Sequence, residues 1–218
     1  MKTILCWLDD RIGYSETIKP LIEHPVPPTG WDYTIGSAAL IAFTVQVVTG
    51  VALAFSYVPT PDHAYESLEF ITSGAILGSV VRGIHFWGAS LLIVVALLHM
   101  TFVFWTGGYR APREVNWMVG VIVFLLILAF SLTGSLLPWD VNSYLARGRE
   151  LSILSGSSVL PGGVSEFLKN VLQGGPIIGP ATLLRFYIAH VFLLPAVIVG
   201  LMYVHFRLVR RQGPAEPS

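Results

Sequence analysis

Four histidines stand out because they lie in uncharged, apolar stretches of the chain. His85 and His99 fall between Arg82 and Arg110, and no charged residue lies between those two arginines. A run of this length can cross a bilayer as a helix. An ionisable side chain within such a helix is costly, so it marks a candidate functional site.

The spacing of these two histidines places them on one face of a helix at two depths. They are fourteen positions apart, which corresponds to about 21 Å along the helix axis and about 40° of rotation. One face that carries two imidazoles at two levels favours two stacked cofactors over a single site.

A second run repeats the arrangement. No charged residue lies between Arg185 and Arg207, and this run holds His190 and His205, fifteen positions apart. That spacing corresponds to about 22 Å along the axis and about 60° of rotation. Core histidines bonded to neighbouring carbonyls would explain one such helix, but the repetition favours ligands on two matching helices.

The composition is that of a membrane protein. The 218 residues are 54% hydrophobic and 12% charged, and the mean hydropathy is +0.69. The net charge of zero gives no electrostatic footprint for nucleic acid. Cys6 is the only cysteine, which excludes an internal disulfide, an iron–sulfur cluster held by several cysteines and a C-x-x-C-H haem attachment site.

The predicted fold is all-α, a four-helix transmembrane bundle with surface helices. Gln46 is the one strongly polar side chain of the first span. Residues 1–30 are predicted to form an amphipathic segment on the membrane surface. The connector 141–181 is expected at the interface, with short helices near 142–155 and 164–172. The spans are predicted at roughly 33–58, 83–106, 115–137 and 182–207.

The charges of the loops predict the orientation of the bundle. The turn 107–114 and the C-terminal end are basic, whereas the connector 59–81 carries three acidic residues and no lysine or arginine. The positive-inside rule therefore places both termini in the cytoplasm. The outer half of the membrane then holds one histidine of each helix, His85 and His190, and the inner half holds the other two.

Each level would bring together two imidazoles, His85 with His190 and His99 with His205. Two helices that each supply one neutral imidazole can hold the iron of a b-type haem between them. A zinc ion would need a tighter tetrahedral cluster, and the two pairs lie too far apart in depth to form one. The sequence therefore predicts two haem b groups in a single di-haem domain, 1–218, with the four histidines as iron ligands.

Small residues are expected where the other two helices pass the edge of a haem. Gly36 and Gly50 lie in the first span and Gly120 and Gly134 in the third, each pair fourteen positions apart. This is the interval that separates the two histidines of the second span. Ordinary close packing of membrane helices at glycine is the alternative for any one of them.

Three arginines near helix ends are candidates to bind haem propionates. They are Arg82, Arg113 and Arg185. The alternative for each is an arginine that extends to the lipid headgroups.

These residues resemble the cytochrome b family, the haem-bearing subunit of the cytochrome bc complexes. The similarity covers nearly the whole chain. The length and the histidine spacing are similar to the short, split form, cytochrome b6, in which a separate subunit supplies the remaining helices. The matching motifs are residues 45–50, the two-histidine second span, 106–114, 133–140, 184–190 and His205-Phe206.

The resemblance implies a subunit of a quinol-oxidising complex that is not active alone. Quinol would be oxidised at the outer face, in a site built partly by residues from about Pro138 on. One electron would pass to a Rieske iron–sulfur protein and a c-type cytochrome. The other would cross through the two haems to a quinone near the inner face. The implied partners are a cytochrome b C-terminal-half (subunit IV-like) protein, the Rieske protein, the c-type cytochrome, quinol and quinone, and membrane lipid, in a dimeric complex.

One departure from the family bears on cofactor and location. In chloroplast-type members a cysteine in the first span anchors an extra haem c, and Thr34 occupies that place here. We therefore expect only non-covalent haem b and no covalent haem c. The same departure favours a multi-pass protein of the bacterial cytoplasmic (inner) membrane over a thylakoid protein.

Two other classes share parts of the pattern. A di-haem membrane anchor of a dehydrogenase or hydrogenase, which exchanges electrons with quinone, would have the same four helices and four histidines. A haem-free scaffold or transporter subunit would share only the helices. The segment Pro138-Trp139-Asp140 and the long connector after it favour the quinol-oxidising family.

Overall fold

The computed structural model describes residues 34–156 and 163–213. The chain divides into two units, Met1–Thr34 and Ile35–Ser218, and the second contains every candidate residue. The predicted amphipathic segment 1–30 and Cys6 lie outside the described residues. The following description therefore concerns the second unit. Its first helix begins at Thr34, one residue before the boundary between the units.

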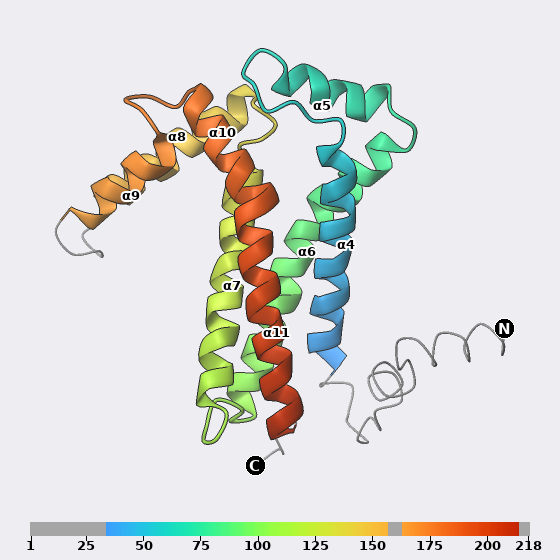
Figure 1. Ribbon diagram of the computed structural model, residues 1–218, viewed down its shortest axis with the longest axis vertical. Coiled ribbons are helices and arrows are strands. Elements are labelled where there is room, and N and C mark those ends of the chain that lie inside the picture. Colours follow the sequence, from blue (N-terminus) through green and yellow to red (C-terminus); the bar gives the residue numbers. More distant parts are fainter. Residues whose placement is uncertain (1–33, 157–162, 214–218) are drawn as a thin grey trace, which may run out of the picture. The chain divides into compact units, whose positions relative to one another are not determined.

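Four long helical rods run side by side (Figure 1). Three are single helices, and the fourth is α10 and α11 joined by a π-helical turn, η2. Each rod is long and apolar enough to cross a membrane, and the described residues contain no strand. The predicted all-helical, four-span fold is confirmed. The helices are α4 (Thr34–Ala54), α6 (Gly78–Trp105), α7 (Glu114–Gly134), α10 (Pro180–Ile188), η2 (Ala189–Leu193) and α11 (Leu194–Gln212).

Large apolar side chains cover the outside of the rods. Ile41 is 65% exposed, Val48 63% and Trp87 72%. Apolar surface of this extent is unfavourable in water, but lipid tails solvate it in a bilayer. The helix lengths and the apolar surface thus agree on a membrane-spanning bundle.

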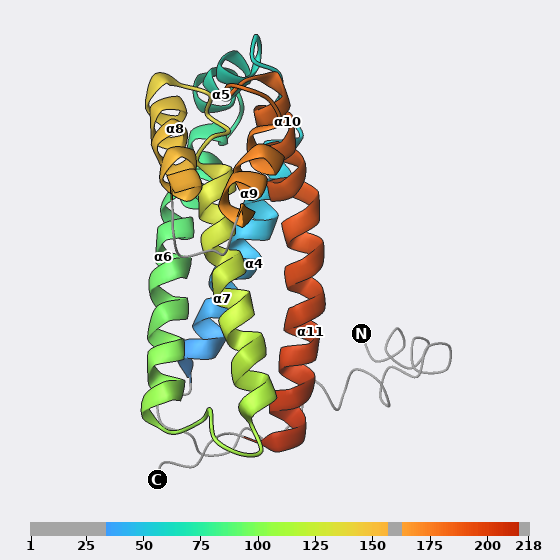
Figure 2. The ribbon, with the colours of Figure 1, turned by 90° about the vertical axis from the view of Figure 1, so that its left-hand side faces the viewer.

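Three further helices gather with α10 at one end of the bundle, opposite the turn between α6 and α7 (Figures 1 and 2). They are α5 (Ala64–Ser73), α8 (Val141–Gly156) and α9 (Val164–Gln173). Two of them lie where the sequence predicts short helices, whereas α5 lies in a segment treated only as an acidic connector. The helix α9 ends at Gly174, whose left-handed backbone (φ +76°) terminates it.

The buried core lies at mid-height of the bundle. Leu92 and Ala96 of α6, Ile127 of α7 and Ile198 of α11 form one cluster, and Phe43 of α4 packs against it. In each histidine-bearing rod these core residues fall between the two histidines of the sequence. An apolar layer therefore separates the level of His85 and His190 from that of His99 and His205, which are named the outer and the inner level after the predicted orientation.

Candidate functional site

The outer level brings together the side chains of His85 on α6 and His190 on η2. Their ring centroids are 6.2 Å apart, and the ring planes are inclined by 78°. A metal–imidazole bond is about 2.0–2.1 Å, and the ring centre lies about 1.1 Å behind the bonded nitrogen, so two imidazoles on opposite sides of one metal have centroids about 6.3 Å apart. The observed separation fits a metal ion held between the two rings.

The inner level brings together His99 on α6 and His205 on α11. Both rings are half-buried, and they lie near each other. Within the described part of the chain, no group of three or more histidine, cysteine, aspartate or glutamate side chains gathers in a metal-binding arrangement. Two imidazoles are a donor set that would hold a haem iron, whereas structural zinc takes four protein ligands.

A threonine fixes the proton of the His85 ring. The Thr49 hydroxyl donates to the Val45 carbonyl at 2.7 Å, and its oxygen lies 2.9 Å from His85 Nδ1. Because the single hydroxyl proton is already donated, the oxygen accepts from Nδ1–H. The other ring nitrogen, Nε2, then carries the free lone pair that a metal requires.

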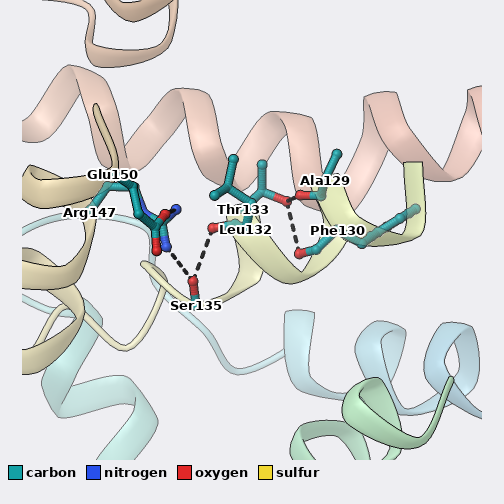
Figure 3. Close-up of polar contacts among 7 residues, drawn as sticks. All are labelled: Ala129, Phe130, Leu132, Thr133, Ser135, Arg147 and Glu150. Atoms are coloured by element: carbon teal, nitrogen blue, oxygen red, sulfur yellow. Dashed lines mark hydrogen bonds and ion pairs between the residues drawn. The ribbon is translucent and has the colours of Figure 1, made fainter. Parts of the chain in front are cut away.

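His190 is held in the same way from α7. The Thr133 hydroxyl donates to the Ala129 carbonyl at 2.8 Å, and its oxygen lies 3.0 Å from His190 Nδ1. Figure 3 shows Thr133 with its acceptors on the preceding turn of α7. Both outer histidines therefore present Nε2 as the available ligand. Sequence reasoning did not identify these threonines, although each directly precedes one of the predicted glycines.

Each of the four predicted glycines lies against the ring of a different histidine. The α4 glycines face the α6 histidines, and the α7 glycines face those of the fourth rod. At two of these positions, Gly134 and Gly36, a side chain would collide with the ring, and at Gly50 the contact would be so tight that the ring must shift by a few tenths of an ångström. A Cβ atom would lie 2.7 Å from His190 Cε1 at Gly134, 2.9 Å from His99 Cε1 at Gly36, 3.1 Å from His85 Cε1 at Gly50 and 4.0 Å from His205 Cε1 at Gly120.

The π turn reconciles the unequal spacings of the two histidine pairs. In unbroken helices, intervals of fourteen and fifteen residues rotate in opposite senses and diverge by about 100°. The turn η2 (Ala189–Leu193) contains His190, and a π turn holds one residue more than an α turn. The fifteen-position interval thus acts as fourteen. Pro195, which has no N–H to donate back to Val191, explains why the helix opens here.

Gln46 ties α4 to the turn of α6 that carries His85. With its amide nitrogen turned toward α6, it donates to the His85 carbonyl at 2.8 Å, and its oxygen accepts from the Ala89 N–H at 3.3 Å. In a regular helix these two backbone groups form a hydrogen bond with each other. The Gln46 side-chain amide therefore contacts both the donor and the acceptor of one backbone hydrogen bond of α6. Gly88 leaves the room for it, since a Cβ there would collide with the amide.

Tyr57 joins the outer ends of three rods. Its hydroxyl donates to the Leu137 carbonyl at 2.6 Å, and its ring stacks on Tyr187 of α10 with centroids 5.7 Å apart. Burial, reinforced by Tyr187, raises the pKa of the Tyr57 phenol above its usual value. The phenol is therefore a neutral structural donor.

The three candidate arginines each bond to a protein group. Arg82 donates to the Thr72 hydroxyl at 2.7 Å, and Arg185 donates to the Val171 carbonyl. At the opposite end, Arg113 donates to the Gln212 carbonyl at 3.4 Å. Arg82 and Arg185 thus belong to the outer end and Arg113 to the inner end, and their role toward propionates stays a prediction.

Comparison with known proteins identifies the class. The family model cytochrome b/b6/petB matches residues 22–213. The cytochrome b subunit of menaquinol:cytochrome c reductase from Bacillus subtilis is 37% identical, over 100% of this chain and 99% of its own. Cytochrome b6 from Heliobacterium modesticaldum is 39% identical, over 97% of this chain and 99% of its own.

A solved structure supports the same assignment. The chain superposes on a chain of a hyperthermophilic respiratory Complex III with a TM-score of 0.85 and 28% identity. The alignment covers 96% of this chain but 55% of the other, so the present chain spans about half the length of that structural relative. The chain belongs to the cytochrome b family, which confirms the resemblance drawn from its motifs and favours it over an unrelated di-haem anchor.

Proposed function

We propose that this chain is the di-haem cytochrome b subunit of a quinol:cytochrome c-type oxidoreductase. It would carry electrons across the membrane between an outer quinol-oxidising site and an inner quinone-reducing site. The observation that carries the proposal is the outer pair, because His85 and His190, with ring centroids 6.2 Å apart and both Nε2 atoms available, could hold one iron between them. The inner pair of His99 and His205 supplies the second level.

Different residues of the chain would have different roles in binding haem. When bound, haem supplies one-electron transfer at a potential set by its ligands and surroundings. The four histidines would ligate iron, and Gly36, Gly50, Gly120 and Gly134 let the backbones lie against the rings. The hydroxyl oxygens of Thr49 and Thr133 accept hydrogen bonds from the Nδ1–H groups of the outer histidines. The arginines Arg82, Arg113 and Arg185 are the candidate partners of the propionates.

The proposal includes a location and partners. The relatives are named as subunits of a menaquinol:cytochrome c reductase or as cytochrome b6, and the same kind of complex is proposed here. Its other members would be a subunit IV-like protein, a Rieske protein and a c-type cytochrome. The basic turn and the basic C-terminal end favour cytoplasmic termini in a bacterial inner membrane.

A reduced-minus-oxidised spectrum of the purified complex tests the proposal directly. We expect two low-spin b-type haems per chain, both extractable by acidified acetone because Thr34 offers no thiol for covalent attachment. Haem that stays on the chain in denaturing electrophoresis would contradict the non-covalent assignment. A preparation that folds in membranes without haem would refute the proposed function.

Turnover tests the subunit role. The isolated chain is expected to be reduced by chemical reductants but not to transfer electrons from quinol to a soluble cytochrome c. The intact complex should do so and should be blocked by outer-site quinol inhibitors. Inhibitor-sensitive turnover by the chain alone would favour a self-contained quinol enzyme.

A further inference from the structure

A fully buried arginine lies at the outer end of the bundle and has no part in the function proposed above. Arg147 of α8 is 1% exposed and is the largest fully buried side chain of the described residues. Its guanidinium donates to the Ser135 hydroxyl at 2.5 Å and pairs with the Glu150 carboxylate (Figure 3). Its Nε has no hydrogen-bond partner within the described residues.

The surroundings of Arg147 connect it to the outer histidine level by two short routes. Ser135 follows Gly134 directly, and a Cβ at Gly134 would touch His190. The Arg147 Cζ also lies 5.7 Å from the ring centre of Phe186, which is itself buried and precedes His190 by four residues. One helical turn rises about 5.4 Å, so the guanidinium is on the order of 10 Å from the outer ligands.

The charge at this position is not balanced symmetrically. Burial lowers the pKa of Arg147, and the neighbouring Glu150 carboxylate opposes this shift. An arginine keeps its proton even when it is buried, so the guanidinium is charged. The Glu150 side chain is 43% exposed, against 2% for that of Arg147. Water therefore screens the carboxylate more than the guanidinium, and a net positive field reaches the apolar interior.

We propose that the positive charge of Arg147 raises the reduction potential of the outer haem and that Glu150 limits the size of this increase. This inference rests on the proposed function, since it requires a haem at the outer level. A cation favours the reduced form of the haem because that form carries one more electron. At about 10 Å and an effective dielectric constant of about 20, one unit charge changes such an equilibrium roughly tenfold.

Potentiometric titration of both haems in the purified complex tests the inference. Arg147→Gln should lower the equilibrium constant for reduction of the outer haem about tenfold, which is about 59 mV for one electron. Glu150→Gln should shift it in the opposite direction by a smaller factor, because the cation is then unopposed. Arg147→Lys should stay near the wild-type potential. The inner haem of the same molecule is the internal reference.

The matched control is Arg149→Gln, which removes the same charge from an exposed position two residues along α8. It should leave both potentials unchanged within a factor of two. An outer potential that ignores Glu150→Gln, or that moves equally in Arg149→Gln, would overturn the inference. If Arg147→Gln loses the outer haem, Glu150→Gln still decides the sign of the shift, and an outer potential that falls about tenfold in Arg147→Lys would overturn the electrostatic role. A complex without any haem would instead refute the proposed function.

Discussion

Replacement of the four glycines by alanine, one at a time, should separate close packing of helices from contact with metal ligands. The added methyl group would meet the His190 ring at 2.7 Å in Gly134→Ala, but it would meet the His205 ring only at 4.0 Å in Gly120→Ala. The first distance is one that real Cβ atoms do not show, and the second is ordinary van der Waals contact. Both positions lie in α7, Gly120 in its second turn and Gly134 as its last residue.

The expected cost follows from what can move. The His190 ring is held through Nδ1 by Thr133 at 3.0 Å, and as an iron ligand it would be fixed through Nε2 as well. Overpacking of a fixed group costs about 1–3 kcal/mol, which is roughly 5- to 150-fold in haem retention. Without that collision, alanine for glycine in a helix interior stabilises by about 0.5–1 kcal/mol. A loss of haem therefore indicates contact between the glycine and a metal ligand, whereas unchanged or improved retention indicates ordinary helix packing.

The assay is the haem content and spectrum of each variant complex, normalised to the amount of chain in the membrane. Gly134→Ala should lose the outer haem, Gly36→Ala should weaken the inner one, Gly50→Ala should have a smaller effect on the outer one, and Gly120→Ala should be close to wild type. Full outer haem in Gly134→Ala would refute the reasoning and return the glycines to plain helix packing. An equal loss in all four variants would contradict the order that the distances predict.

Three further predictions concern the ligands themselves. His99→Ala should remove the inner haem and leave the outer one, as read from the optical spectrum; loss of both would mean that the levels are not independent. Thr133→Val should weaken retention of the outer haem about tenfold, since partners of metal ligands contribute about that much, whereas Thr44→Val, at an exposed position with the same bond to its own helix, should have no effect. Deletion of Val191 should convert the π turn to a regular α turn and retain both haems, whereas deletion of Val199 should turn His205 by about 100° and remove the inner haem; equal spectra for the two deletions would contradict the role of η2.

The histidine and glycine pattern could be predicted from the sequence because helical periodicity is local. An interval of fourteen residues specifies a face and a depth before any tertiary contact is known. The sequence also placed helices near 142–155 and 164–172, where α8 and α9 lie. It did not predict that each glycine would face one histidine, because that match depends on how the four rods pack.

The features that the sequence reasoning missed depend on contacts between elements. The π turn required recognising that Pro195 interrupts the hydrogen-bond ladder inside an apolar span. Thr49 and Thr133 resemble any helix threonine whose hydroxyl bonds to its own backbone, and only the fold shows that the same oxygens accept from imidazoles. The burial of Arg147 could not be read from a connector that mixes charged and apolar residues.

The two histidine levels are alike in sequence interval but different in chemistry. Threonine precedes the glycine at both outer positions, whereas Ile35 and Val119 precede the inner ones, Gly36 and Gly120. The outer rings therefore gain a hydroxyl acceptor at Nδ1, which makes an imidazole a stronger donor to a metal. At the inner level the backbone of Asn116 approaches the His205 ring, yet the buried Nδ1 lacks a partner of hydrogen-bond geometry within the described residues. If both levels hold haem as proposed, this difference lowers the outer potential relative to the inner one and favours electron flow inward. The field of Arg147 acts in the opposite sense, so the outer potential would reflect the balance of a ligand effect and a buried charge.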